Sequence, residues 1–205
     1  MAASPSPTAE ARSGSEDLLA KVVLVGPPGV GKAAIVKRVA EHYAHSSVRA
    51  GEIGEGKIFR TEFFWPTPVQ DGRRLRVRLF GISGQPAYNA VSELVLAKAD
   101  GVVFVADLRR AQGPAVRESL QDLVQTAGRN GLDLATLPVA LHYHCPVLAP
   151  FLEPEEMDRW LGIASGSVAR FVTGPGDNGP MRAPVEWIVA QIAQGANQSG
   201  GSPHS

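Results

Sequence analysis

A glycine-rich loop that directly follows a buried strand constrains the fold of this chain more than any other feature. Residues 26–32 read Gly-Pro-Pro-Gly-Val-Gly-Lys and follow the apolar run Lys21–Val25. An unbroken apolar run is typical of a strand covered on both faces, and apolar side chains at helical spacing follow Lys32. Backbone N–H groups and the helix dipole favour a phosphate group in such a loop. The pattern predicts a phosphate-binding loop in which Lys32 reaches the β- and γ-phosphates.

Short apolar runs alternate with longer stretches of helical period along the rest of the chain. This alternation is typical of βαβ units that build a mainly parallel sheet. The turn residues Asp71-Gly72 predict antiparallel pairing between the second and third strands. We expect an α/β fold of the P-loop NTPase class, with six strands over 21–25, 58–64, 75–79, 101–106, 138–143 and 167–172, and five helices over 33–44, 88–98, 113–129, 153–161 and 183–194.

Both ends of the chain lack the apolar residues of a packed core. The first 17 residues are mainly Ala, Ser, Pro and acidic residues, and the last read GANQSGGSPHS. Such segments bury too little apolar surface to offset the entropy lost on ordering. We therefore predict disordered tails over 1–18 and 195–205 and one domain over 19–194.

Composition argues against several classes of protein. Lys and Arg together number 20, as do Asp and Glu, and the sequence shows no basic patch for nucleic acid or an anionic membrane. Cys145 is the only cysteine, so no intrachain disulfide can form. No apolar run approaches the roughly 18 residues of a membrane helix, and the N-terminus has no apolar signal segment. We expect a cytoplasmic protein without stable membrane insertion.

The residue after the loop lysine departs from the phosphate-loop pattern. That position normally carries Ser or Thr, whose hydroxyl coordinates Mg²⁺, whereas this chain has Ala33 followed by Ala34. A methyl group cannot ligate a metal. The sequence predicts no metal ligand here and weakened magnesium binding, with a water molecule as the alternative to the hydroxyl.

Segments beyond the loop resemble a known family. Residues 79–90 (LFGISGQPAYNA) and 98–107 (KADGVVFVAD) resemble the second switch and following strand of the bacterial MglA-type (mutual gliding protein) small GTPases. Residues 131–138 (GLDLATLP) are similar to the same family, and the resemblance extends over residues 21–194. It implies a Ras-like fold, binding of GTP and GDP, and a role as a switch in cell polarity or gliding motility.

The resemblance also implies roles for individual residues. Residues 59–64 match the first switch, in which Arg60 would be a built-in arginine finger and Thr61 would sense the γ-phosphate and the metal. Gly84 would contact the γ-phosphate and Gln85 would orient the attacking water. The implied nucleotide-binding residues are Gly26, Gly29, Val30, Gly31, Lys32, Ala33, Thr61, Gly84, His144 and Cys145, and the catalytic residues of an active enzyme are Arg60 and Gln85.

Other positions of the family pattern carry residues that cannot make the usual contacts. Gly81 stands where Ras-like proteins usually have Asp and MglA-type members often have Thr. The guanine-binding motif Asn-Lys-x-Asp aligns with His-Cys-Pro-Val at 144–147, so Val147 offers no carboxylate to the guanine. A charged hydrogen bond contributes about 1.5–3 kcal/mol. The last family motif finds no clear match near residues 173–177, so we expect weak binding with poor selection for guanine.

Two local patterns allow a second interpretation. His142, His144 and Cys145 could form part of a metal site, although only two or three ligands are local. Asp107 could be the magnesium-binding aspartate of an ATPase, whereas the MglA-like pattern makes it the end of the fourth strand. We favour a strand end in both cases and predict no metal site.

The sequence favours an MglA-like pseudo-GTPase that acts as a regulatory or binding module, because the losses fall on metal and base contacts. A working GTP-hydrolysing switch is the alternative, supported by Lys32, Arg60, Thr61 and Gln85. A P-loop ATPase or kinase is a third interpretation, but no substrate-binding insertion or lid is evident. Family analogy suggests a protein partner, such as a roadblock-type (MglB-like) regulator, and no nucleic acid.

Overall fold

Strands and helices alternate along most of the chain in the computed structural model, which describes residues 17–43, 46–53, 56–83, 88–145, 151–164, 166–174, 176 and 180–199. The strands in these residues are β1 (Leu18–Val25), β2 (Arg49–Ile53), β3 (Gly56–Phe64), β4 (Leu75–Ser83), β5 (Gly101–Asp107), β6 (Val139–His144) and β7 (Ala169–Thr173). The helices are α1 (Lys32–His42), α2 (Tyr88–Leu96), α3 (Gly113–Arg129), α4 (Pro154–Leu161) and α5 (Ala183–Ser199). The predicted α/β class is confirmed.

All of these strands belong to one sheet with the order β2-β3-β4-β1-β5-β6-β7. β3 pairs antiparallel with both β2 and β4, and the other neighbours are parallel. The carboxyl ends of parallel strands meet at one edge of a sheet, which is where ligands bind in open α/β folds. The loop after β1 therefore lies at the same edge as the ends of β5, β6 and β7.

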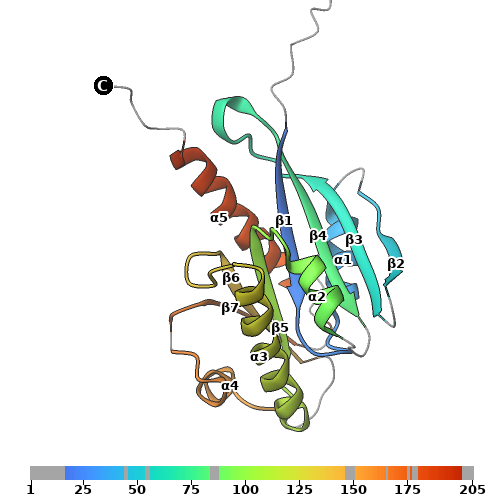
Figure 1. The fold of residues 1–205 in the computed structure, drawn as a ribbon, viewed down its shortest axis with the longest axis vertical. Coiled ribbons are helices and arrows are strands. Elements are labelled where there is room, and N and C mark those ends of the chain that lie inside the picture. The colour runs from blue at the N-terminus through green and yellow to red at the C-terminus, as the bar shows by residue number, and fades with distance from the viewer. Residues whose placement is uncertain are drawn as a thin grey trace, which may run out of the picture.

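Helices cover both faces of the sheet (Figure 1). On one face α1 and α5 bury their apolar side chains, among them Ile35, Val36 and Ile188. On the other face α2, α3 and α4 bury a second set, which includes Leu96 and Met157. Every residue of the central strand β5 is buried. Because full burial of an aliphatic side chain contributes about 1.5–3 kcal/mol, these two cores hold the loop-bearing edge in place.

The β3–β4 hairpin confirms the predicted antiparallel pair. Thr61 lies opposite Leu79 in the register of these strands. Asp71 and Gly72 in the connection have φ angles of 56° and 72°. An antiparallel bridge between Val69 and Arg73 closes a turn at these residues, and left-handed backbone at consecutive residues is typical of such a turn.

The described residues hold seven strands rather than the predicted six. The additional strand, β2, has the sequence Arg-Ala-Gly-Glu-Ile, which lacks an apolar alternation and has glycine at its centre. Its pairing with β3 makes it a strand, because edge strands depend on neighbours more than on propensity. Residues 195–199, expected in the C-terminal tail, continue the helix α5 to Ser199.

Candidate phosphate-binding site

The loop between β1 and α1 has three glycines in left-handed or related conformations. Gly26, Gly29 and Gly31 have φ angles of 138°, 75° and 97°. A Cβ atom added to Gly26 would lie 2.0 Å from the carbonyl oxygen of Val105, so β5 leaves no room for any side chain. A Cβ at Gly29 would meet no atom within 4 Å. Packing therefore requires glycine at 26, whereas backbone conformation alone favours it at 29.

Several N–H groups of this loop remain available for a ligand. The backbone N–H groups of Gly29, Val30 and Gly31 donate no hydrogen bond to any residue that the structure describes. Gly31 precedes α1 and contributes no side-chain cap, and the first N–H groups of a helix have no acceptor within it. Unpaired donors at a helix N-terminus favour an oxyanion.

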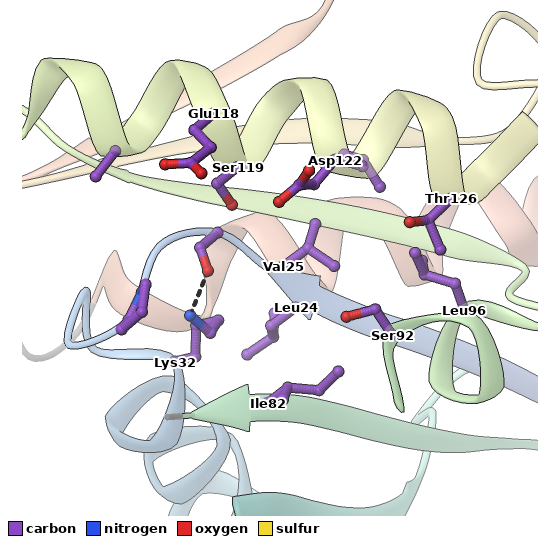
Figure 2. A pocket seen from close by; sticks show the side chains of 14 residues that line it. Leu24, Val25, Lys32, Ile82, Ser92, Leu96, Glu118, Ser119, Asp122 and Thr126 are labelled. Carbon is purple, nitrogen blue, oxygen red and sulfur yellow. Dashed lines mark hydrogen bonds between the residues drawn. The ribbon is translucent and has the colours of Figure 1, made fainter. Parts of the chain in front are cut away.

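The loop also encloses the ammonium group of Lys32. Lys32 is only 3% exposed, and its Nζ donates hydrogen bonds of 2.6 Å to each of the carbonyl oxygens of Gly26 and Pro27. Figure 2 shows the Lys32 side chain with one of these hydrogen bonds. An ammonium group has three donors, so one remains for a phosphate oxygen. Burial lowers the pKa of Lys32 from 10.5 to about 8. The loop thus fixes a cation beside unpaired N–H groups.

Phosphate binding at Lys32 is expected to weaken at alkaline pH. The free protein has a Lys32 pKa of about 8, and a bound phosphate raises it, because an opposite charge favours the ammonium form. Binding is therefore coupled to proton uptake above pH 8, and linkage predicts a fall in GDP affinity of up to about tenfold per pH unit. Titration calorimetry from pH 7.5 to 9.5 measures this slope. The Lys32→Met variant should show a flat profile, and an equal slope in that variant would assign the titration to another group.

A cavity of about 440 Å³ adjoins Lys32 between β1, α2 and α3. Figure 2 shows Leu24, Val25 and Ile82 on the sheet side and Ser119 and Asp122 on α3. Aliphatic side chains and the carboxylates of Glu118 and Asp122 do not suit the charge of a phosphate. The candidate phosphate site is therefore the loop rather than this cavity.

Neither Ala33 nor Gly81, the two departures from the family pattern near the loop, offers a ligand to Mg²⁺. Ala33 carries only a methyl group. A Cβ at Gly81 would lie 3.2 Å from Val36 Cγ2 and 3.5 Å from the carbonyl oxygen of Lys32, so α1 fills the space of a side chain. Among the described residues, no group of three or more His, Cys, Asp or Glu side chains could hold a metal ion. These residues do not fit a directly held Mg²⁺.

His142 and His144 both lie within hydrogen-bond distance of the hydroxyl of Thr173. Thr173 Oγ1 lies 2.8 Å from His142 Nε2 and 2.9 Å from His144 Nδ1. A hydroxyl has one proton, so a histidine N–H is the donor in at least one of these hydrogen bonds. Burial, helped by the charge of His144, lowers the pKa of His142 to about 4. The pair ties β6 to β7 rather than forming a metal site.

His144 also connects the ends of β6 and β7 to the phosphate loop. A Cβ at Gly31 would lie 3.6 Å from His144 Cδ2, so the imidazole lies against the loop. The next residue, Cys145, is buried, and its N–H donates to the carbonyl oxygen of Thr173 at 3.0 Å. The structure therefore brings His144 and Cys145 to the predicted edge. Val147 lies outside the described residues.

The carboxylate of Asp107 accepts hydrogen bonds from Arg109. It is the last residue of β5 and 3% exposed. Arg109 donates to it from its backbone N–H at 2.8 Å and from Nε at 2.8 and 3.0 Å, and also from a terminal guanidinium nitrogen. A carboxylate held in this way is part of a turn after β5. The interpretation of Asp107 as a strand end is supported.

Arg60 and Thr61 do not lie at the phosphate loop. Both are central residues of β3, paired with Phe80 and Leu79 of β4, and not part of a loop. The Arg60 side chain is exposed, whereas Thr61 is 3% exposed and its hydroxyl has no partner among the described residues. The predicted first switch is thus a regular strand here, because residues 59–64 alternate between the two faces of the sheet. Gly84 and Gln85 lie outside the described residues.

The sequence did not predict that Thr173 links His142 and His144. It lies 31 residues from His142 and 29 from His144 along the chain. Only the parallel register of β6 and β7, in which His144 pairs with Thr173, brings them together. The sequence indicated only that His142 and His144, two residues apart in a strand, lie on the same face of the sheet.

Comparison with known proteins agrees with this geometry. Residues 21–135 match the family model described as Roc, Ras of Complex, domain of DAPkinase. The chain is 27% identical over 194 residues to the mutual gliding-motility protein MglA of Myxococcus xanthus, covering 88% of this chain and 96% of that protein. It is 28% identical over 92 residues to the Ras-related protein Rab-15 of Homo sapiens, covering 45% of this chain and 40% of that protein. The predicted resemblance to MglA-type proteins is confirmed.

Proposed function

This chain belongs to the Ras-like small GTPase family, and on that premise we propose that it is a pseudo-GTPase that binds nucleotides mainly through their phosphates. The observation that carries the proposal is the buried Lys32 ammonium, which keeps one donor beside the unpaired N–H groups of the loop. The protein would act as a regulatory or binding module whose nucleotide state a partner reads.

The phosphate contacts that we propose come from the loop alone. Gly26 and Gly29 set its backbone, and the N–H groups of Val30 and Gly31 face no internal acceptor. The ammonium of Lys32 meets the phosphate charge as a point charge. Arg60 is not part of this set, because it lies on an exposed strand face in this structure.

Weak metal binding is the second part of the proposal. Ala33 offers no hydroxyl, and the side-chain space at Gly81 is filled by Val36 and the backbone of α1. Without a well-held cation, charge that develops on the transferred phosphoryl group is poorly neutralised. Hydrolysis should therefore be slower than in an ordinary small GTPase.

Weak selection for guanine is the third part. His144 occupies the first position of the guanine-reading motif, and its imidazole lies against Gly31 and bonds to Thr173. Together with Val147 in place of the motif's carboxylate, this supports nucleotide binding without strong base selection. A roadblock-type partner and a role in cell polarity or gliding motility follow from similarity to MglA and form part of the proposal.

Restoring a hydroxyl at position 33 tests the metal part of the proposal. Ala33 is only half-buried, so Ala33→Thr should fit at the start of α1 and add a ligand for Mg²⁺. We expect GTP affinity to become at least about tenfold more dependent on Mg²⁺, which corresponds to about 1.4 kcal/mol, and hydrolysis to rise. Calorimetry with and without Mg²⁺ and a phosphate-release assay measure both.

The neighbouring variant Ala34→Thr is the matched control, because the side chain at 34 is exposed and follows the ligand position. It should leave Mg²⁺ dependence unchanged. Wild-type protein that hydrolyses GTP at the rate of an ordinary small GTPase with full Mg²⁺ dependence would contradict the pseudo-GTPase proposal and support the active switch.

A further inference from the structure

We infer that the open face of β2, β3 and β4 binds an acidic segment of a partner protein. Four arginines, Arg49, Arg60, Arg76 and Arg78, form this arginine face. Arg76 and Arg78 belong to the run Arg-Arg-Leu-Arg-Val-Arg at 73–78, whereas Arg49 and Arg60 are distant in the sequence. Only the pairing of three strands brings all four to one face. The inference is independent of nucleotide binding.

The register of the sheet places like charges directly opposite each other. Arg49 of β2 pairs with Arg60 of β3, and Arg60 pairs with Phe80 of β4. Glu62 pairs with Arg78 one step along the same face. Residues opposite each other in an antiparallel pair share a face, and like charges there repel. The fold therefore places two arginines side by side on one face of the sheet.

The arginine face lacks the carboxylates that would neutralise it. Glu62 is the single acidic residue in these paired rows, and it accepts from Arg78 Nε at 2.8 Å and from Arg76 at 3.4 Å. Arg49 and Arg60 are exposed and form no ion pair with any described residue. Glu52 points to the opposite face, since it pairs with Lys57 and alternates with Gly51. Four guanidinium groups thus share one carboxylate.

The face is hollowed rather than flat. A cavity of about 410 Å³ is lined by Arg49, Arg60, Glu62, Arg78 and Phe80, with Ser47 and Thr61 beside them. A cavity of this size accommodates several side chains rather than a single small anion. Guanidinium groups bind carboxylates in bidentate fashion and stack on aromatic rings, so carboxylates and the apolar stems of Glu or Asp side chains both find contacts.

A short acidic segment fits this surface better than a long polyanion. The whole chain has equal numbers of basic and acidic residues and a formal net charge of zero. Nucleic acid or an anionic membrane would extend past the arginine face, where the next arginine, Arg74, already pairs with Asp17. A segment of a few Asp or Glu residues contacts only the hollow.

The test uses the nucleotide-free full chain and a fluorescent peptide of eight glutamates. We expect Arg49→Gln/Arg60→Gln to weaken binding at least tenfold at 50 mM salt, measured by anisotropy. The matched control is Lys57→Gln/Arg110→Gln, which removes the same charge from two exposed residues. Lys57 lies on the opposite face of β3 and Arg110 follows β5. This control should change the affinity for the peptide less than twofold. Raising the salt to 200 mM should weaken wild-type binding.

A second measurement does not depend on the peptide. Arg49→Gln removes one of two like charges that lie opposite each other, so it should raise the thermal midpoint at low salt. Lys57 lies opposite Glu52, so Lys57→Gln should not raise the midpoint. Equal peptide affinity of the wild type and the arginine double variant, or no binding by the wild type, would overturn the inference. Arginine-dependent binding of anionic vesicles or an RNA oligonucleotide without peptide binding would overturn it as well.

Discussion

Lys32→Met should weaken the binding of GDP and GTP by about tenfold to a hundredfold. Lys32 is the buried cation of the phosphate loop and keeps one N–H for the ligand. A hydrogen bond to a charged group contributes about 1.5–3 kcal/mol, and about 2.7 kcal/mol corresponds to a hundredfold change. Titration calorimetry of nucleotide-stripped protein measures the loss.

Folding of this variant can be checked separately. Burial already lowers the pKa of Lys32 to about 8, so the charged form is penalised in the folded state and its replacement by an apolar side chain should not unfold the protein. Lys37→Met, at a side chain 72% exposed on α1, is the control and should keep wild-type affinity. A folded Lys32→Met protein with wild-type affinity would show that phosphates bind elsewhere.

Gly26→Ala should be among the most destabilising single substitutions in the chain. Its Cβ would lie 2.0 Å from the carbonyl oxygen of Val105 and 3.0 Å from the carbonyl carbon, at a φ of 138°. Both contacts are with the backbone of the buried strand β5, which cannot move without disturbing both cores. We expect a loss of about 4 kcal/mol or more in the free energy of unfolding, beyond the usual range for single substitutions.

Gly29→Ala provides the comparison within the same loop. Its φ of 75° is also unfavourable for alanine, but its Cβ would meet no atom within 4 Å. The expected loss is about 1–2 kcal/mol, the cost of a left-handed backbone alone. Urea unfolding without nucleotide measures both variants. Equal losses would contradict the close approach of β5 to Gly26.

The phosphate loop and the order of elements could be predicted because their signals are local. A buried strand, glycines and a following helix are adjacent in the sequence, and the predicted helix over 113–129 coincides with α3. β2 was missed because its residues have no strand pattern of their own. The extra turns of α5 were missed because Gly195 and the polar residues after it indicate a helix end.

Parts of the site could not be predicted because they depend on register between strands. The position of Arg60 opposite Arg49 follows from the pairing of β2 with β3, and β2 was not predicted. The close contact between Gly81 and α1 depends on the packing of Val36, which no sequence pattern specifies. Family resemblance suggested that Arg60 and Thr61 reach the phosphates, whereas the strand pattern over 58–64 predicted the position within β3 that both residues have.

Calorimetry of the nucleotide-stripped wild type with GTP, GDP and ATP, each with and without Mg²⁺, distinguishes a pseudo-GTPase from an active switch. We expect measurable binding of all three nucleotides, with Mg²⁺ changing the affinity by less than about tenfold. We also expect a preference for GTP over ATP below about a hundredfold, since the guanine-reading carboxylate is absent. A larger preference for GTP, together with binding that requires Mg²⁺, would contradict the pseudo-GTPase proposal.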